Sequence, residues 1–308
     1  MGQYALRRLL QMIPVLLGTT FLIFAMVFAL PGDPFEGKCG ERPCPEAYIQ
    51  AQTAKFGLDQ PLIVQYGKFL GNLLTGDFGT TFSGEPVINE LTRALPPTLK
   101  LTILAIGFEV LIGITAGVFA ALKRGRFLDN LVLVSTLVVV SIPVFVLGYF
   151  AQYIFGVKLG WFSPTVGFGA PWGDLILPAL VLASLSLAFV ARLMRTTMVE
   201  NIRADYVRTA TAKGLPRREV VGKHVMRNSM IPVITFIGLD FGGLMGGAVV
   251  TEGIFNIKGI GGLIFLSIRT REGATVTAAI TVIVVFILII NLLVDLLYGV
   301  LDPRIRYE

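Results

Sequence analysis

Long apolar runs alternate with shorter polar segments along the whole of this chain. A helix that crosses a membrane needs about 20 apolar residues, because the hydrocarbon core is about 30 Å thick. Six runs are long enough, and they cover residues 9–30, 98–122, 131–155, 175–194, 231–250 and 274–300. The pattern predicts an all-α integral membrane protein with six transmembrane helices.

The composition agrees with this interpretation. The chain has 308 residues, of which 54% are hydrophobic and 15% are charged, and its mean hydropathy is +0.76. An ordinary soluble domain has about 25% charged residues. The first apolar run is longer than the core of a signal peptide and is not followed by a clear cleavage site, so we expect it to remain as the first helix.

The polar segments divide the chain into three parts. Residues 1–30 are expected to form an amino-terminal transmembrane helix, residues 31–97 a segment outside the membrane, and residues 98–308 a membrane core with five further helices. The core includes a long charged loop at residues 195–230. This division predicts one membrane-embedded body with a folded segment on one side and a charged loop on the other.

The outside segment is too polar to span a membrane and too rich in Gly and Pro to form one helix. Spaced apolar positions in residues 45–75 predict short amphipathic helices, with turns at 57–61 and 76–79. Pro96 and Pro97 are expected to end the segment, so that the second transmembrane helix begins at Thr98.

The net charge of +6 has two readings, nucleic-acid binding and membrane topology. With the amino terminus inside, most of the 26 basic residues fall on inside segments, as the positive-inside rule requires. The basic excess therefore predicts orientation, with both termini and the 195–230 loop in the cytoplasm. It gives no reason to expect a nucleic-acid partner.

Cys39 and Cys44 are the two cysteines, and they lie close together in the outside segment. A disulfide there is plausible in an oxidising compartment, and two unpaired thiols are the alternative. Two thiols without a nearby histidine make a poor metal site.

Three acidic residues lie inside apolar runs: Glu109, Asp240 and Asp295. Burying a carboxylate in a membrane is costly, so each is a functional candidate. For Asp295, near the end of its run, we expect a structural role. Glu109 and Asp240 are either structural partners of other helices or part of the lining of a polar path.

The fifth apolar run carries a repeat of small residues every four positions. Such a repeat allows another helix to approach closely, either within the chain or from a partner. The repeat consists of Gly238, Gly242, Gly243, Gly246 and Gly247.

The sequence offers little chemistry of its own. No Gly-Lys pair is followed by Ser or Thr, so the phosphate-binding loop of an ATPase is missing. The single histidine, His224, has no cysteine or fixed acid near it in sequence. We expect no catalytic residue, no cofactor site and no metal site in this chain. The chain by itself is therefore not expected to be an enzyme.

The 195–230 loop has internal structure. Asp205 is able to cap a short helix, Gly214 suits the left-handed position after it, and Pro216 prevents its continuation. These signals predict a helix of somewhat more than two turns, about 12 to 15 Å long. A short helix presented by two membrane spans is a docking device for a partner protein, and a basic loop lying on anionic lipid is the alternative.

Residues 206–216, YVRTATAKGLP, resemble the coupling-loop motif of ABC-importer permeases of the dipeptide and oligopeptide group. Further pieces resemble that group in the same order along nearly the whole chain. They are LPGDP at 30–34, GDFG at 76–79, LPPTL at 95–99, TEGIF at 251–255, GIGG at 259–262 and LDPR at 301–304. Arg208 and Thr209 differ from the general importer motif in the way that is usual for this group. The chain departs from the pattern at Thr211, Asn228 and Lys258, and the cysteine pair is not part of it.

The resemblance implies a type I ABC-importer fold and one membrane subunit of a larger complex in a bacterial inner membrane. Its implied partners are the lipid bilayer, a second homologous permease, two cytoplasmic ATPase subunits that bind ATP and Mg, and a peptide-binding protein outside. The residues implied in coupling to the ATPases are Asp205, Tyr206, Val207, Arg208, Thr209, Ala210, Ala212, Lys213, Gly214 and Leu215.

Other functions remain open from sequence. A proton-coupled secondary transporter would use Glu109 or Asp240 and need no ATPase. A structural membrane protein would transport nothing. Within the resemblance, dipeptides, longer peptides, nickel-peptide complexes and glutathione-like substrates are not distinguished.

Overall fold

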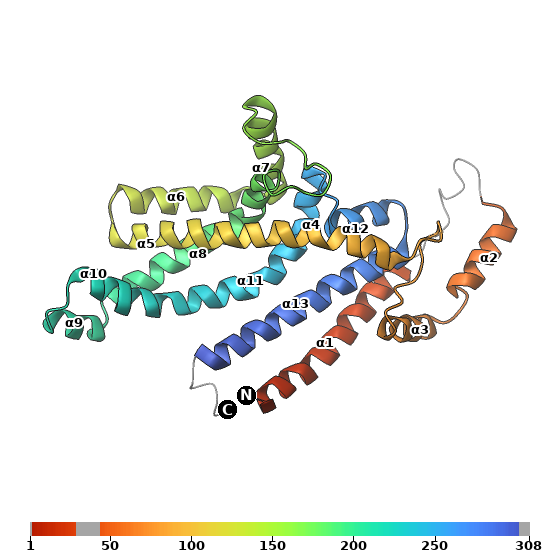
Figure 1. The fold of residues 1–308 in the computed structure, drawn as a ribbon, viewed down its shortest axis with the longest axis horizontal. Helices are drawn as coiled ribbons and strands as arrows, with labels where there is room; N and C mark the ends of the chain where they lie inside the picture. The colour runs from red at the N-terminus through yellow and green to blue at the C-terminus, as the bar shows by residue number, and fades with distance from the viewer. Residues whose placement is uncertain (1, 29–43, 302–308) are drawn as a thin grey trace. The chain divides into compact units, whose positions relative to one another are not determined.

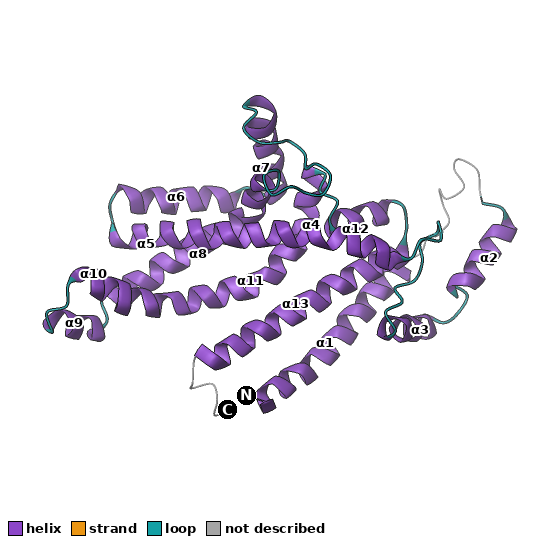
Figure 2. Cartoon of the chain, viewed as in Figure 1, coloured by secondary structure: helices purple, strands orange, loops and turns teal. Residues whose placement is uncertain are grey.

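The computed structural model describes residues 2–28 and 44–301, and Figure 2 shows that helices make up nearly all of this part of the chain. An isolated antiparallel bridge joins Thr80 and Pro86. Five helical segments are long and apolar enough to cross a membrane: Leu6–Phe28, Val87–Leu122, Ile176–Ile202, Arg217–Phe255 and Gly273–Leu296. Five of the six predicted spans are therefore present as continuous helices.

The remaining predicted span, residues 131–155, is broken in the middle. Helix α6 (Phe127–Ser141) and helix α7 (Val144–Ala151) with its π-helical extension η2 (Gln152–Lys158) are bent by 103° at the break. Proline disfavours a helical backbone in the residue before it and donates no amide hydrogen, and Ile142, which precedes Pro143, is extended. The expectation of an uninterrupted helix here is wrong, because hydropathy does not register a proline inside an apolar run.

The chain forms two units, which we describe separately. The first, residues 1–98 and 258–308, contains α1 (Gly2–Phe28), α2 (Glu46–Phe56), α3 (Leu62–Leu74), α12 (Ile260–Arg269), α13 (Gly273–Leu301) and the start of α4 (Val87–Phe108). The second, residues 99–257, contains the rest of α4, η1 (Glu109–Gly113), α5 (Ile114–Leu122), α6, α7, η2, α8 (Ile176–Ile202), α9 (Asp205–Ala212), α10 (Arg217–Glu219), η3 (Val220–Val225) and α11 (Met226–Phe255).

In the first unit, α1 and α13 pack along each other (Figure 1). Gly273 allows the close contact at one end, since a Cβ added there would lie 2.9 Å from Val27 Cγ1. Arg8 and Asp295 join the same two helices elsewhere, with Nε and Oδ2 3.1 Å apart. Asp295 therefore has the structural role expected of it.

The short helices expected before the second span are α2 and α3. Gly57 and Gly76 follow them with positive φ angles of 64° and 77°, which glycine adopts without strain. Tyr66 of α3 donates a hydrogen bond to the Leu17 carbonyl oxygen of α1 at 2.9 Å. Cys39 lies outside the described residues, so its disulfide with Cys44 stays a prediction.

Helix α4 begins eleven residues before the expected start at Thr98, because it runs from Val87 through Pro96 and Pro97. The fixed φ angle of proline fits a helix, and the cost is the loss of two amide donors. The expected boundary between residues 97 and 98 therefore falls inside this helix. Thr98 is buried, and its hydroxyl accepts a hydrogen bond from the Ile260 amide at 2.8 Å.

In the second unit, α8 is the central helix and packs against α5, α6, α7 and α11. Two glycines permit the contact with α5 and η1. A Cβ on Gly117 would lie 2.6 Å from the Ala191 carbonyl oxygen, and one on Gly113 would lie 2.9 Å from Val190 Cγ1. Close helix approach through small residues is typical of membrane bundles.

The glycine repeat of α11 is only partly used in this way. Gly242 is buried, and a Cβ on Gly247 would lie 3.4 Å from Leu182 Cδ1 of α8. Gly238 is half-buried, Gly243 is exposed, and nothing described lies within 4 Å of a Cβ on Gly246. The tightest glycine contacts of this unit thus lie outside the repeat, at Gly117 of α5 and at Gly148 of α7, where an added Cβ would lie 2.7 Å from Ile254 Cδ1.

Candidate functional site

The short helix expected in the charged loop is α9, which lies beyond the end of α8 (Figure 1). Its eight residues give a length of about 12 Å. Gly214 follows with φ of +81°, so the expected left-handed stop is present. The expected cap is wrong: Ala204 occupies the N-cap position without a side-chain hydrogen bond, and Asp205 is the first helical residue. There its charge still faces the positive end of the helix dipole.

One face of α9 is packed onto the membrane helices. Val207 and Ala210 are 7% and 6% exposed, and they belong to a cluster with Met194 and Met198 of α8 and Val225 of η3. This face fixes α9 against the bundle through apolar contacts. Val207 and Ala210 are therefore packing residues and are not available to another protein.

Hydrogen bonds strengthen this attachment. The Tyr206 hydroxyl donates to Asn201 Oδ1 at 2.6 Å, and Asn201 Nδ2 donates to the Ser229 hydroxyl at 3.1 Å. Thr197 of α8 donates to the Ser229 carbonyl oxygen at 3.2 Å, and Ser229 is fully buried. The network links α8, α9 and α11. Sequence reasoning did not single out Asn201 or Ser229, because their spacing follows no motif.

The opposite face of α9 and the turn after it are exposed, although the Tyr206 hydroxyl is bonded to Asn201. Leu215 is half-buried. The exposed residues of the predicted coupling set are Asp205, Tyr206, Arg208, Thr209, Ala212, Lys213 and Gly214. Arg208 lies 3.5 Å from Asp205, a contact between two exposed groups that contributes little to stability.

After α9 the chain returns to the membrane as one continuous helix. Pro216 precedes α10, which passes through η3 into α11, so that helix runs without interruption from Arg217 to Phe255. The expected second helix of the loop is thus the first part of a membrane span. Helix α9 is held directly between two spans, α8 and α11.

The two acids in the middle of the second unit form a different arrangement. Glu109 is the first residue of η1 and is fully buried, and neither of its carboxyl oxygens has a hydrogen-bond partner in the described chain. Asp240 of α11 lies near enough to interact with it electrostatically, and its Oδ2 also has no partner there. The two predicted residues therefore interact electrostatically, although they belong to different helices. A π-helical turn such as η1 is frequent at functional sites.

A third acidic site was not predicted. Asp129, 2% exposed at the start of α6, accepts hydrogen bonds from Arg195 Nε at 2.6 Å and Arg195 Nη2 at 2.9 Å. It also accepts a hydrogen bond from the Gly125 amide at 2.8 Å. This site ties the turn between α5 and α6 to α8. The only sequence signal was an acid in the first turn of a helix, which is common and unspecific.

Comparison with known proteins identifies the architecture. Residues 113–307 match the family described as binding-protein-dependent transport system inner membrane component, and residues 1–102 match the amino-terminal part of such membrane components. The chain belongs to this family. It is thus a multi-pass permease subunit of an ABC importer, and the resemblance to the dipeptide and oligopeptide group is confirmed.

The similarity to individual relatives covers the whole length of the chain. The chain is 38% identical to the dipeptide transport system permease protein DppB of Alkalihalophilus pseudofirmus, with 99% of each chain covered. It is 41% identical to the glutathione transport system permease protein GsiC of Shigella flexneri, and 40% identical to that of Escherichia coli strain K12, with 100% of each chain covered.

A solved structure agrees on the fold. The crystal structure of an amino acid ABC transporter with histidines has a TM-score of 0.50 at 19% identity, covering 68% of this chain and 93% of that one. Permeases of this family work in general with a second permease, ATPase subunits and a substrate-binding protein.

Proposed function

We propose that this permease is one of two homologous membrane subunits of a bacterial inner-membrane importer for short peptides, and that α9 transmits the motion of two cytoplasmic ATPases. The proposal includes both termini in the cytoplasm, residues 31–97 outside, and a peptide-binding protein on that side. ATP and Mg would be bound by the ATPases.

The observation that carries this proposal is the attachment of α9. Its buried face and its hydrogen-bond network join it to both α8 and α11, while its other face is exposed. A helix attached in this way moves with the spans as one body. Contacts that differ between ATP-bound and free ATPases would then shift the population of inward-open and outward-open states.

Glu109 and Asp240 are proposed as part of the translocation path. Both lie in spans, and neither carboxyl group is fully satisfied by the described chain. A polar substrate crossing the membrane needs such groups along its route. A proton-coupled secondary transporter would use the same pair, and uptake driven by a pH gradient without ATPases would support that alternative.

Gly214→Pro tests whether α9 transmits the motion of the ATPases to the membrane spans. Proline fixes φ near −65°, whereas Gly214 has +81°, so the substitution disrupts the end of α9. We expect the complex to assemble, with peptide uptake below about one tenth of wild type and ATP hydrolysis no longer stimulated by the binding protein. Gly222→Ala is the matched control, because a Cβ there meets nothing within 4 Å. Wild-type uptake by Gly214→Pro would contradict the proposal.

The substrate class needs a separate experiment, because the relatives transport either dipeptides or glutathione according to their names. We expect the importer, reconstituted with its own binding protein, to take up labelled dipeptide and to be inhibited by excess unlabelled dipeptide more strongly than by glutathione. Stronger inhibition by glutathione would assign it to the second class.

A further inference from the structure

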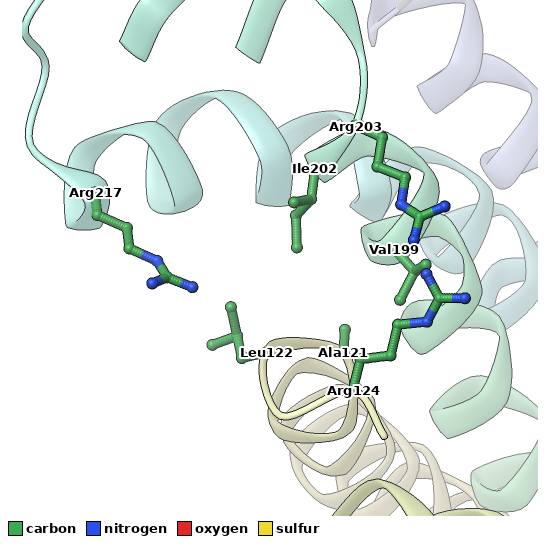
Figure 3. A pocket seen from close by; sticks show the side chains of 7 residues that line it. All are labelled: Ala121, Leu122, Arg124, Val199, Ile202, Arg203 and Arg217. Carbon is green, nitrogen blue, oxygen red and sulfur yellow. The ribbon is translucent and has the colours of Figure 1, made fainter. Parts of the chain in front are cut away.

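A pocket of about 220 Å³ lies beside the attachment of α9, at the end of the second unit where α5, α8 and α10 meet (Figure 3). Three of its lining residues are Arg124, Arg203 and Arg217. In Figure 3 the side chains of Arg124 and Arg203 extend along one side, while Arg217 points into the hollow from the other. These residues come from three elements separated along the chain.

Within the described residues none of the three arginines is held in an ion pair, although Arg124 lies near enough to Asp129 to interact with it electrostatically. None of the described residues lining the pocket is acidic. Among the acids on neighbouring elements, Asp129 pairs with Arg195, Asp205 with Arg208, and Glu219 with Lys223, while Glu200 of α8 is exposed and forms no ion pair in the described chain. Three neighbouring guanidinium groups that are not held in ion pairs favour an anion, and their geometry matches that of phosphate oxygens.

The rest of the pocket wall is apolar. Ala121 and Leu122 of α5 line it together with Val199 and Ile202 of α8. A free inorganic anion makes no favourable contact with apolar side chains. A molecule that carries a phosphate next to a hydrocarbon chain would satisfy both parts of the pocket.

The position of Arg124 places the pocket at the surface of a bilayer. Arg124 lies in the short turn between α5 and α6, and an apolar span ends just before it. The next helix starts at once with Phe127 and Leu128, which are 77% and 42% exposed. A turn of four residues between two membrane helices lies near the headgroups.

We propose that this pocket binds an anionic phospholipid, with the headgroup phosphate held by Arg124, Arg203 and Arg217 and the start of an acyl chain on Leu122 and Val199. Basic pockets between membrane helices are a known type of lipid site. The bound lipid would join the ends of α5, α8 and α10. The site is distinct from the exposed face of α9.

The test compares lipid binding by the full-length permease purified in detergent, measured by native mass spectrometry with phosphatidylglycerol and phosphatidylcholine. We expect wild type to retain phosphatidylglycerol in preference to phosphatidylcholine. Replacing the three arginines by Gln should weaken phosphatidylglycerol binding at least tenfold. Replacement by Lys, which keeps the charges, should hold it within about threefold.

A matched control removes three charges elsewhere. Arg7, Arg218 and Arg227 are exposed and do not line the pocket, so their replacement by Gln should leave phosphatidylglycerol binding unchanged. The single variant Arg217→Gln should leave the fold intact, because this exposed side chain makes no described hydrogen bond or ion pair. The variant should bind the lipid more weakly than wild type, and this weaker binding would therefore not result from misfolding.

Three results would overturn the proposal. The first is unchanged phosphatidylglycerol binding by the triple Gln variant. The second is displacement of the lipid by inorganic phosphate at equal concentration, which would make the ligand a free phosphate. The third, measured on the importer purified with its ATPase subunits, is loss of these subunits from the triple Gln variant with lipid binding retained, which would make the pocket part of a protein interface.

Discussion

Asp129 and Glu109 are both buried acids of the second unit, yet their surroundings are opposite. Asp129 receives three hydrogen bonds, two from Arg195 and one from Gly125. Glu109 receives none from the described chain and interacts electrostatically with a second acid, Asp240. A buried carboxylate that is fully paired holds helices together, whereas an unpaired one lowers stability and is retained for another reason. The difference separates the scaffold from the proposed translocation path.

The largest expected effect comes from Asp129→Ala. It leaves Arg195 without its partner and the Gly125 amide without an acceptor, so we expect the free energy of unfolding to fall by about 3 kcal/mol. Thermal unfolding of the purified protein measures this change. Asp59→Ala removes an exposed acid and should have almost no effect. A loss no larger than that of the control would mean that Asp129 is not part of the scaffold.

Glu109→Met should act in the opposite direction. It replaces two unpartnered oxygens by apolar atoms of similar volume, so the free energy of unfolding should rise by about 1 kcal/mol. Peptide uptake should fall in the same variant if the residue lines the path. If Glu109→Met destabilises the protein as much as Asp129→Ala does, then Glu109 is part of the scaffold and the contrast between the two acids is wrong.

A smaller effect is expected from Tyr206→Phe, which removes the hydrogen bond to Asn201 and keeps the ring. The attachment of α9 should weaken by about 1 kcal/mol. This corresponds to amide hydrogen exchange in α9 that is about fivefold faster. Tyr149→Phe, which alters an exposed hydroxyl elsewhere in the unit, should leave this exchange unchanged. Unchanged exchange in Tyr206→Phe would assign the attachment of α9 to its apolar face alone.

The smallest effect is expected at Asp295, whose ion pair with Arg8 is partly exposed at 22% and 42% for the two side chains. Asp295→Asn should lower the free energy of unfolding by about 0.5 kcal/mol, and added salt should reduce the difference from wild type. An effect as large as that of Asp129→Ala would show that partial exposure does not weaken this pair.

Local signals in the sequence were sufficient for much of the fold. Five apolar runs became continuous spans, and Gly214 with Pro216 correctly placed the end of α9. The errors in the predicted spans arose at proline, which breaks a helix at one position and is accommodated within a helix at another. Pro143 breaks a helix inside an apolar run, whereas Pro96 and Pro97 are accommodated within α4. Which outcome occurs depends on where the freed carbonyl groups find partners, and that is not a local property.

The candidate site was predictable in outline but not in detail. The motif at residues 206–216 indicated a docking helix, yet it did not separate Val207 and Ala210, which are buried, from the exposed residues beside them. Nor did it indicate Asn201 and Ser229, which lie 28 residues apart and meet only when α8 and α11 pack together.

The sequence by itself determined membrane insertion, the family and the end of α9, because these depend on apolar runs, turn residues and motifs that act over a few neighbouring positions. Tertiary structure decided which buried acid has a partner and which arginines share a pocket. Arg124, Arg203 and Arg217, like Asp129 and Arg195, come from different helices, and only the packing of those helices sets the distances on which electrostatic and hydrogen-bond energies depend.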